Sequence, residues 1–521
     1  MTASNPLFPL AGRSRPLLIA LATCAAWAAA CSGKAETETK ARQGTAVGGA
    51  PYAAGTGVAG ASVLAGRLAS ASGAGGRAPA LAGALAIAGA PSGGAGGLSG
   101  RAGTSAGTAA VSGTGASGNR AAAGASGAAG AGTPTATGPV TFSTNVRLND
   151  DTGSARQTEV ALAAGPDGLV LAGWMDERAN RVCAFSFSTD GGATWSKNVS
   201  IPQNGGVFVG DPAVAIDGGG TLYAVCQNYL NSQGSAGNVR MMTSSDRGAT
   251  WSEIRTVQSA PDKPWAHGGT SDGVVFLSWL GNPGGIKRSL DHGLTWGPVQ
   301  SLGNIIHGTG ISTSTTGLVH VPYNLDSNRN QLRYLRSKDN GATYETPRDL
   351  LPDMGTFCFS CNPRQHPIVG SSSDPTGKYV AITWASRMSG GEGDDDVWLL
   401  YSKDGGETWT KPIRVNDNKT ASRQFESWVA VDAYGRVHVA WTDFRNSGQN
   451  ETWYARSADP TQGFEPNIQV TDGRGSGRTD FLGDYKGIAV QGSDVLIVWQ
   501  DTRKDSGDIY FARAVGAAGA P

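Results

Sequence analysis

Charged and aromatic side chains recur at one place in the sequence pattern, shortly before several short apolar segments. Residues 156–159 (RQTE) match residues 423–426 (RQFE), and Asp211, Asp484 and Tyr485 occupy comparable positions. Carboxyl groups and a tyrosine within hydrogen-bond reach of one another can serve as general acid, general base or nucleophile. Residues of these types are available for acid–base or nucleophilic chemistry, but no fixed spacing singles them out. The candidate catalytic residues are Tyr485, Glu426, Glu159 and Asp484.

Basic, aromatic and imidazole side chains stand at similar places before other apolar segments. An opening that is lined by both acidic and basic groups suits a small polar ligand. The candidate ligand-binding residues are Arg156, Asp211, Lys263, Trp265, His307, Arg364, His366 and Arg423. The alternative is that these groups hydrogen-bond neighbouring strands, because buried polar groups are normally satisfied inside a protein.

A second motif, W-x-D-x-R, adds three arginines to the ligand-binding candidates. Its copies contain Trp174, Asp176 and Arg178; Trp441, Asp443 and Arg445; and Trp499, Asp501 and Arg503, with a partial copy in Trp384 and Arg387. A ring of guanidinium groups would suit an acidic ligand, since their fork geometry matches carboxylates. The repetition favours the alternative, in which each Asp–Arg pair fixes a loop or links neighbouring repeats.

An eight-residue pattern, S-x-D-x-G-x-T-W, divides the chain into the repeats that must position these residues. Five copies occupy 188–195, 244–251, 289–296, 337–344 (ending in Tyr) and 402–409, and a degenerate sixth begins at Ser457. Asp followed by Gly two residues later is typical of a turn. Each copy therefore predicts a hairpin turn whose aromatic residue packs between repeats. A spacing of about 45–65 residues indicates a repeat architecture.

This pattern resembles the Asp-box, or bacterial neuraminidase repeat, of the sialidase superfamily. In that family the box joins the third and fourth strands of a β-propeller blade, on the face away from the active site. The resemblance therefore implies structural roles for Asp190, Trp195, Asp246, Trp251, Asp291, Trp296, Asp339, Tyr344, Asp404 and Trp409.

The same resemblance implies glycoside hydrolysis of the exo-α-sialidase type. Sialidases use a tyrosine nucleophile activated by a carboxylate, an acid/base Asp, and three arginines that hold the substrate carboxylate. Tyr485 with Glu426 or Glu159 would supply the nucleophile and its activating carboxylate. The sequence departs from the family in one respect, because it contains no F/Y-R-I-P motif early in the domain.

From about residue 139 the chain is rich in aromatic and β-branched residues with frequent turn signals, and this composition predicts an all-β fold. Seven pairs of second and third strands are expected at 169–174 with 182–187, 222–226 with 239–243, 274–279 with 285–288, 318–323 with 331–336, 379–384 with 397–401, 437–441 with 451–456, and 495–499 with 508–513.

The last repeat lacks a fourth strand, because the chain changes to Gly and Ala after Arg513. Residues 146–150 (VRLND) match 413–417 (IRVND), the expected fourth strand of the fifth repeat. We therefore predict a seven-bladed β-propeller over 139–516 that its N-terminal strand closes. Six blades, as in well-known sialidases, is the alternative, and residues 517–521 form a short tail.

Two segments precede this domain. Residues 1–31 combine charged and apolar regions typical of an export signal, and the apolar region is too short to span a bilayer. They end in AAAC, which resembles a bacterial lipobox with Cys31 as the lipidated residue. Cys24 is a second candidate, and cleavage to a soluble secreted protein is the alternative. Gly, Ala, Ser and Thr dominate residues 32–138, which predicts a disordered tether. We therefore expect an exported protein, either a cell-surface or outer-membrane lipoprotein or a secreted one.

Four cysteines follow the export signal, and an even number in an exported protein predicts disulfides. We expect a local bridge between Cys358 and Cys361 and a second bridge between Cys183 and Cys226. A metal site at Cys358, Cys361 and His366 is the alternative, although one CxxC beside a histidine is a weak zinc signal. No metal or cofactor is predicted, and only a structural Ca²⁺ is left open.

The chain has 42 basic and 42 acidic side chains. A net charge near zero argues against nucleic acid or an anionic membrane surface as the main partner. We expect contact with a membrane only through the lipid anchor, and we expect a monomer. The leading functional prediction is a propeller that engages extracellular glycans or another polar ligand at the mouth of its central channel. The alternatives are an exo-α-sialidase and a protein-interaction platform.

Overall fold

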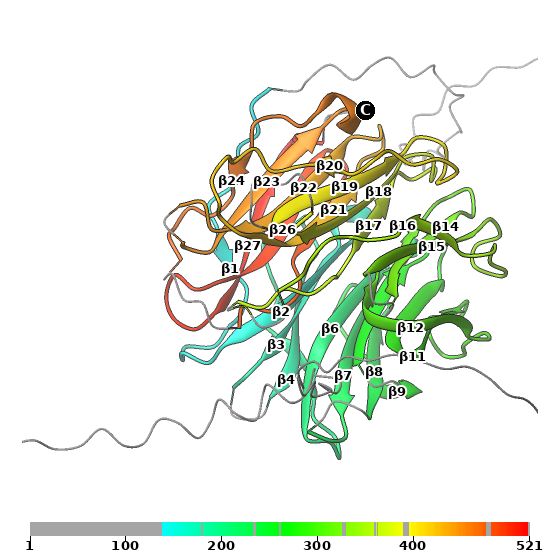
Figure 1. Ribbon diagram of the computed structural model, residues 1–521. Coiled ribbons are helices and arrows are strands. Elements are labelled where there is room, and N and C mark those ends of the chain that lie inside the picture. Colours follow the sequence, from blue (N-terminus) through cyan, green and yellow to red (C-terminus); the bar gives the residue numbers. More distant parts are fainter. Residues whose placement is uncertain are drawn as a thin grey trace, which may run out of the picture. The chain divides into compact units, whose positions relative to one another are not determined.

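The computed structural model describes residues 138–518 (Figure 1), with gaps at 179–180, 233–235, 260–261, 326–329, 359–360, 362, 389–394, 447 and 476–480. The backbone of residues 306–307 is described, but their side chains are not. The predicted export signal with Cys31, the predicted tether up to residue 137 and the end of the predicted tail lie outside the described residues.

The described chain is all-β, as predicted. It contains 27 β-strands and two short 3-10 turns, η1 (Pro166–Gly168) and η2 (Pro460–Gln462). Within these residues, no helix has the length and apolar character needed to cross a bilayer. Most strands belong to four-stranded antiparallel sheets in which consecutive strands are neighbours.

Five sheets have four strands each: β2 (Gln157–Ala164), β3 (Val170–Asp176), β4 (Val182–Ser188) and β5 (Val199–Pro202); β6 (Phe208–Ile216), β7 (Leu222–Tyr229), β8 (Gly237–Ser244) and β9 (Arg255–Ser259); β17 (Gly370–Ser373), β18 (Val380–Ser386), β19 (Asp396–Ser402) and β20 (Ile413–Arg414); β21 (Gln424–Val431), β22 (Val437–Asp443), β23 (Glu451–Ser457) and β24 (Ile468–Gln469); and β25 (Gly487–Gln491), β26 (Asp494–Asp501), β27 (Asp508–Ala514) and β1 (Val146–Arg147). The sixth sheet contains β10 (Asp262–Gly268), β11 (Val275–Ser289), β12 (Gln300–Thr309), β13 (Ser312–Thr313), β14 (Val319–Leu325), β15 (Gln331–Ser337) and β16 (Arg348–Leu351).

The sheets pack face to face around a closed ring. β6 contacts β2 and β3, β10 contacts β6, β17 contacts β13, β21 contacts β17 and β18, and β25 contacts both β21 and β2. Inner strands such as β3, β22 and β26 are buried along their whole length, because a neighbouring sheet covers each of their faces. The hydrophobic core is therefore divided into clusters between sheets.

The N-terminal strand closes the ring, as the sequence predicted. β1 pairs antiparallel with β27, so that Val146 lies opposite Phe511 and Arg147 opposite Tyr510. Leu148 continues the ladder, since its N–H donates to the Ile509 carbonyl at 2.8 Å. Strands from the two ends of the domain thus complete one sheet, and each removes an exposed edge of the other.

The region of the predicted third and fourth repeats differs from expectation. Segments 274–279 and 285–288, predicted as two strands, belong to the single strand β11, whose first half pairs with β10 and second half with β12. β12 is long enough to reach β14, where Ile305 lies opposite Leu325. Both predicted repeats therefore share one sheet. The described strands form six hydrogen-bonded sheets, and seven blades rather than six stays a prediction.

The five Asp-box turns share one hydrogen-bond pattern. In the first copy, the Asp190 carboxylate accepts from the Ser188 hydroxyl at 2.7 Å and the Thr194 N–H at 2.9 Å, while Ser188 accepts from the Gly192 N–H at 2.8 Å. Hydrogen bonds from the Thr194 side chain and backbone lower the pKa of Asp190 to about 2. The same three contacts recur around Asp246, Asp291, Asp339 and Asp404.

Each box also packs against the preceding sheet. The Trp195 ring meets Phe511 of β27 edge-on, with ring centroids 5.0 Å apart, and Trp409 meets Tyr334 of β15 in the same way at 5.2 Å. Gly192 has a φ of +89°, and a Cβ at this position would lie 2.3 Å from the Phe511 ring. The box glycine is therefore required by both the turn and the packing.

Gly192→Ala should lower the free energy of unfolding by about 1–3 kcal/mol more than Gly492→Ala, because overpacking adds to the backbone cost. Gly492 has a similar positive φ of +59°, but nothing lies within 4 Å of a Cβ there. Urea unfolding of both variants measures the difference. Equal losses in the two variants would show that the contact with Phe511 is unimportant.

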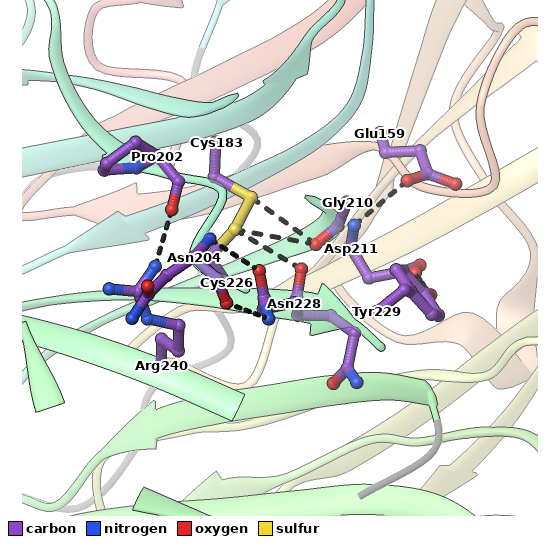
Figure 2. The surroundings of a disulfide bond; sticks show 11 residues. Glu159, Cys183, Pro202, Asn204, Gly210, Asp211, Cys226, Asn228, Tyr229 and Arg240 are labelled. Atoms are coloured by element: carbon purple, nitrogen blue, oxygen red, sulfur yellow. Dashed lines mark hydrogen bonds between the residues drawn. A yellow bond between two sulfur atoms is a disulfide. The ribbon is translucent and has the colours of Figure 1, made fainter. Parts of the chain in front are cut away.

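Two disulfides are present, Cys183–Cys226 and Cys358–Cys361. The first joins β4 to β7 of the next sheet, and its sulfur atoms lie 3.4 and 3.9 Å from the carbonyl oxygen of Gly210. Figure 2 shows this bridge beside the backbone of Asp211, whose N–H donates to Glu159. The bridge thus fixes the strand that carries one of the candidate site residues.

Candidate functional site

Four charged candidates share one structural position near the start of a first strand. They are Glu159, Asp211, Lys263 and Glu426, whose φ values lie between 44° and 54°. The pairing register shifts at each of them, which marks a β-bulge. A bulge re-aims a side chain, and a positive φ outside glycine costs about 1–3 kcal/mol and is concentrated at functional sites. The recurrence of this strained conformation singles out the position.

Tyr485 occupies the matching position of the last sheet. In β21, Trp428 stands two residues after Glu426 and pairs with Ala440, the residue before Trp441 of the W-x-D-x-R motif. In β25, Gly487 stands two residues after Tyr485 and pairs with Val498, the residue before Trp499 of the same motif. Side chains from separate sheets therefore converge at this level of the ring, as the sequence pattern indicated.

Lys263 is the centre of the charged cluster. Its ammonium group lies 3.1 Å from Asp211, 2.7 Å from Asp484 and 2.9 Å from the Tyr485 hydroxyl. The lysine is only 2% exposed. Burial by itself lowers the pKa of Lys263, but Asp211 and Asp484 outweigh burial and raise it well above its usual value. The lysine is therefore charged, and three acceptors use its three N–H donors.

Arg364 holds Asp484 from the other side. Its Nε and Nη2 lie 3.1 and 2.7 Å from the two carboxylate oxygens of Asp484, and His366 Nε2 lies 3.7 Å from one of them. Burial opposes ionisation of Asp484, but Lys263 and Arg364 hold its pKa well below the usual value. Burial lowers the pKa of His366 to about 4, so this imidazole is neutral near pH 7.

Asp211 is the carboxylate that contacts Tyr485, rather than the sequence-based choices Glu426 and Glu159. The Tyr485 hydroxyl donates to Asp211 Oδ1. Burial opposes ionisation of Asp211 too, but Lys263 and the tyrosine hydroxyls lower its pKa. Glu159 instead accepts the Asp211 N–H at 3.1 Å, and burial together with Asp211 raises the pKa of Glu159 well above its usual value.

Sequence reasoning missed two members of the cluster, Tyr229 and Asp262. The Tyr229 hydroxyl lies within hydrogen-bond distance of both Asp211 Oδ2 and Asp262 Oδ1. A phenol has one proton to donate, so the Tyr229 hydroxyl can donate to only one of these two carboxyl groups. Burial and the charge of Asp211 raise the pKa of Asp262 to about 7, so Asp262 is the member of the pair that takes up a proton more readily. Tyr229 ends β7 and Asp262 adjoins Lys263, and no motif marks either.

A pocket lies beside this cluster, where three sheets meet. Its empty space is about 330 Å³, mouth included, and its walls come from the segment before β17, from β18 and β21, and from the segment before β25. The lining side chains that bear on chemistry are Arg364, Gln365, His366, Glu426, Trp428 and Asp484. Much of this space is open solvent at the mouth, and the enclosed part has room for about one water-sized group, such as a single ligand hydroxyl.

Glu426 lines this pocket together with Asp484, and it is the carboxyl group that no cation holds at hydrogen-bond distance among the described residues. Its Oε2 accepts from the Thr442 hydroxyl at 2.7 Å, while its Oε1 is buried without a hydrogen-bond partner among the described residues. Burial raises the pKa of Glu426 to about 8 and lowers that of Lys486 to about 8. Near pH 7 the glutamic acid is therefore mostly protonated and can donate a hydrogen bond.

The W-x-D-x-R arginines lie in a different environment. Each guanidinium bridges the Asp of its own motif and an Asp that follows the outer strand of the neighbouring sheet. The pairs are Arg178 with Asp176 and Asp150, Arg445 with Asp443 and Asp417, and Arg503 with Asp501 and Asp472. These contacts fit the structural interpretation of the motif, and ligand binding by the three arginines remains untested.

The remaining candidates are also placed. Arg156 contacts Glu177 at 2.6 Å and Arg423 contacts Asp395 at 2.8 Å. The Trp265 ring meets Tyr485 edge-on, with centroids 5.5 Å apart. The His307 side chain lies outside the described atoms.

Cys358 and Cys361 form a disulfide, so their sulfur atoms are not available as the metal ligands considered as the alternative. Asp217, Asp272 and His292, near the third Asp-box, form a group of metal-ligating types in the described part of the chain. Asp217 already accepts hydrogen bonds from Gly219, Thr221, Tyr223 and Gly273. Its oxygens are thus engaged, and the group is a poor ion site.

Comparisons with known proteins give one family match and several similar solved structures. Residues 400–411 match the model of the BNR/Asp-box repeat. Similar solved structures include a protein of unknown function from Dyadobacter fermentans DSM 18053, with 14% identity over 72% of this chain and 99% of that chain and a TM-score of 0.45. The phage phi92 endosialidase has 12% identity over 71% and 68% of the two chains and a TM-score of 0.44. The intramolecular trans-sialidase from Ruminococcus gnavus has 14% identity over 70% and 96% and a TM-score of 0.36. With its five Asp-box turns and its closed ring of sheets, the described chain has a β-propeller fold and carries the BNR/Asp-box repeat.

Proposed function

We propose that this protein is an exported propeller, surface-displayed or secreted, that binds an extracellular glycan or another polar ligand in the pocket between Arg364 and Glu426. One observation carries the proposal. Aromatic, acidic and amide side chains from three sheets converge on a single pocket. The export-signal pattern of residues 1–31, with Cys31 as the lipid site, supports the location.

Trp428 is the side chain best suited to recognise a sugar. It lines the pocket and is partly exposed, and it stands two residues after Glu426 as Trp265 stands two residues after Lys263. Sugar rings present apolar C–H faces and hydroxyl edges, so a partly exposed indole beside hydrogen-bonding groups matches both. The Tyr485 ring lies between the two tryptophans, with centroids 5.5 Å from Trp265 and 6.5 Å from Trp428.

Trp428→Ala should weaken glycan binding at least tenfold, which corresponds to about 1.4 kcal/mol. The full chain is first screened on a glycan array, and the tightest glycan is then titrated by calorimetry against wild type and variant. Trp453→Ala is the matched control, because Trp453 is also partly buried and lies beneath Arg445, outside the pocket. Equal affinity of Trp428→Ala and wild type would remove the pocket from the proposal.

A second candidate function, glycoside hydrolysis of the exo-α-sialidase type, is favoured by the contact of Tyr485 with Asp211. Burial raises the pKa of Tyr485 well above its usual value, so the phenol would attack only as Asp211 takes its proton. In that step the Tyr485 oxygen bonds to the anomeric carbon, the glycosidic bond breaks, and a protonated carboxyl such as Glu426 gives its proton to the leaving oxygen. Water would then hydrolyse the glycosyl-tyrosine bond.

Tyr485→Phe should abolish turnover of a fluorogenic sialoside if this second function holds, because the nucleophilic oxygen is lost. The assay compares the full wild-type chain with the variant between pH 4 and pH 8. Unchanged turnover in the variant would discard Tyr485 as nucleophile. If the wild type does not turn over the sialoside, the sialidase hypothesis is rejected. The glycan array then tests the binding proposal by itself.

A further inference from the structure

The cationic side chains beside the pocket are occupied by the protein's own carboxylates. Two nitrogens of Arg364 donate hydrogen bonds to the two carboxylate oxygens of Asp484. The three N–H groups of Lys263 donate to Asp211, Asp484 and Tyr485. Two cations thus face two carboxylates, and the charges balance. Among the lining side chains, a ligand carboxylate would meet no cation that lacks a carboxylate partner, while Lys486, which donates to the Thr452 hydroxyl at 3.0 Å, lies outside the lining.

The arginines that might have supplied such a cation are engaged in the same way. Arg156 contacts Glu177 and Arg423 contacts Asp395, and the three W-x-D-x-R arginines each bridge two aspartates. An anionic ligand would have to displace a carboxylate from one of these arginines, and stranding a buried carboxylate such as Asp176, Asp443, Asp501 or Asp395 is costly.

The uncharged polar groups of the pocket offer complementary hydrogen bonds instead. Gln365 and Glu426 both line the pocket. Gln365 Oε1 and Glu426 Oε1 are buried and make no hydrogen bond among the described residues, while the Gln365 amide nitrogen donates to the Ala385 carbonyl at 2.8 Å. An amide oxygen accepts, and a protonated carboxyl donates. A ligand hydroxyl, which both donates and accepts, satisfies this pair.

We infer that the pocket selects an uncharged, hydroxyl-bearing ligand, such as a neutral sugar residue, over sialosides and other carboxylate-bearing glycans. This inference rests on the proposed glycan-binding function and specifies its ligand class. It separates this chain from sialidases, whose arginines hold a substrate carboxylate.

The test uses matched pairs on the glycan array, each sialylated glycan beside its desialylated form, and calorimetry on the best pair with the full chain at pH 7. The wild type should bind the neutral member at least tenfold more tightly. Asp484→Asn removes the carboxylate that pairs with Arg364, so it should reduce or reverse the affinity ratio between the neutral and the sialylated glycan. Asp176→Asn removes the carboxylate that pairs with Arg178, which does not line the pocket, so it should leave this ratio unchanged.

The wild-type comparison decides the matter even if Asp484→Asn fails to fold. Tighter or equal binding of the sialylated member would overturn the inference while leaving glycan binding intact. Failure of both members of every pair to bind would overturn the proposed function itself, and the inference with it.

Discussion

Lys263→Met is expected to lower the free energy of unfolding by about 3–5 kcal/mol, because removing one partner of a buried ion pair leaves the other charges uncompensated. Methionine nearly preserves the length of the side chain but removes its three donors. Asp211 and Asp484 would then face each other's charge inside the ring, with only Arg364 to balance them. Urea unfolding at pH 7, followed by tryptophan fluorescence, measures the loss.

Lys338→Met is the matched control. Lys338 also contacts two carboxylates, Glu345 and Glu407, but its side chain is 56% exposed, so its loss should change stability little. In Lys263→Met the pKa values of both aspartates should rise above those of the unfolded chain. The deficit should therefore shrink as the pH falls toward 4. If Lys263→Met loses no more free energy of unfolding than Lys338→Met at every pH tested, the central role given to Lys263 is contradicted.

The wild-type fold should lose stability as the pH rises from about 7.25 to about 8. Burial raises the pKa of Glu426 to about 8 and that of Asp262 to about 7, both above the values of an unfolded chain. A raised folded-state pKa gives stability that is present at low pH and lost as the pH passes through it. Each group contributes at most about 1.4 kcal/mol per pH unit. The buried histidines, whose pKa values are lowered, are neutral in the fold, and in the unfolded chain they are largely neutral only above about pH 7.25, where the prediction therefore begins.

Glu426→Gln should flatten this pH dependence, since the amide cannot ionise. Thermal unfolding of wild type and variant at about pH 7.25, 7.6 and 8 measures the two slopes, in a range where the unfolded histidines are largely neutral. Glu345→Gln is the control: a hydrogen bond from Arg336 lowers the pKa of Glu345 to about 2, so the carboxylate is ionised throughout the range and its loss should leave the slope unchanged. A Glu426→Gln slope equal to that of wild type would show that Glu426 is ionised in the fold.

The architecture was largely predictable because it rests on local repeats. The Asp-box turns are short-range hydrogen-bond patterns, and the match between 146–150 and 413–417 was enough to predict pairing of β1 with β27. The joined third and fourth repeats were not predictable. Their common sheet depends on the length of β12 and its contact with β14, which no turn signal encodes.

The site was predictable in position but not in pairing. The aligned segments 156–159 and 423–426 marked the bulge position, and the structure places Asp211, Lys263 and Tyr485 at the same level. The partner of Arg364 is Asp484, 120 residues away, and a single sequence gives no signal for such a contact. Trp428 was also missed, although its spacing from Glu426 repeats the spacing of Trp265 from Lys263.

The most direct test of the account is a crystal structure of the full chain with the glycan that binds most tightly on the array. The account predicts ordered sugar density in the pocket, with a ring against Trp428 and a hydroxyl between Gln365 and Glu426. A glycan ordered instead against the Asp-box turns or against the W-x-D-x-R arginines, with the pocket empty, would contradict it.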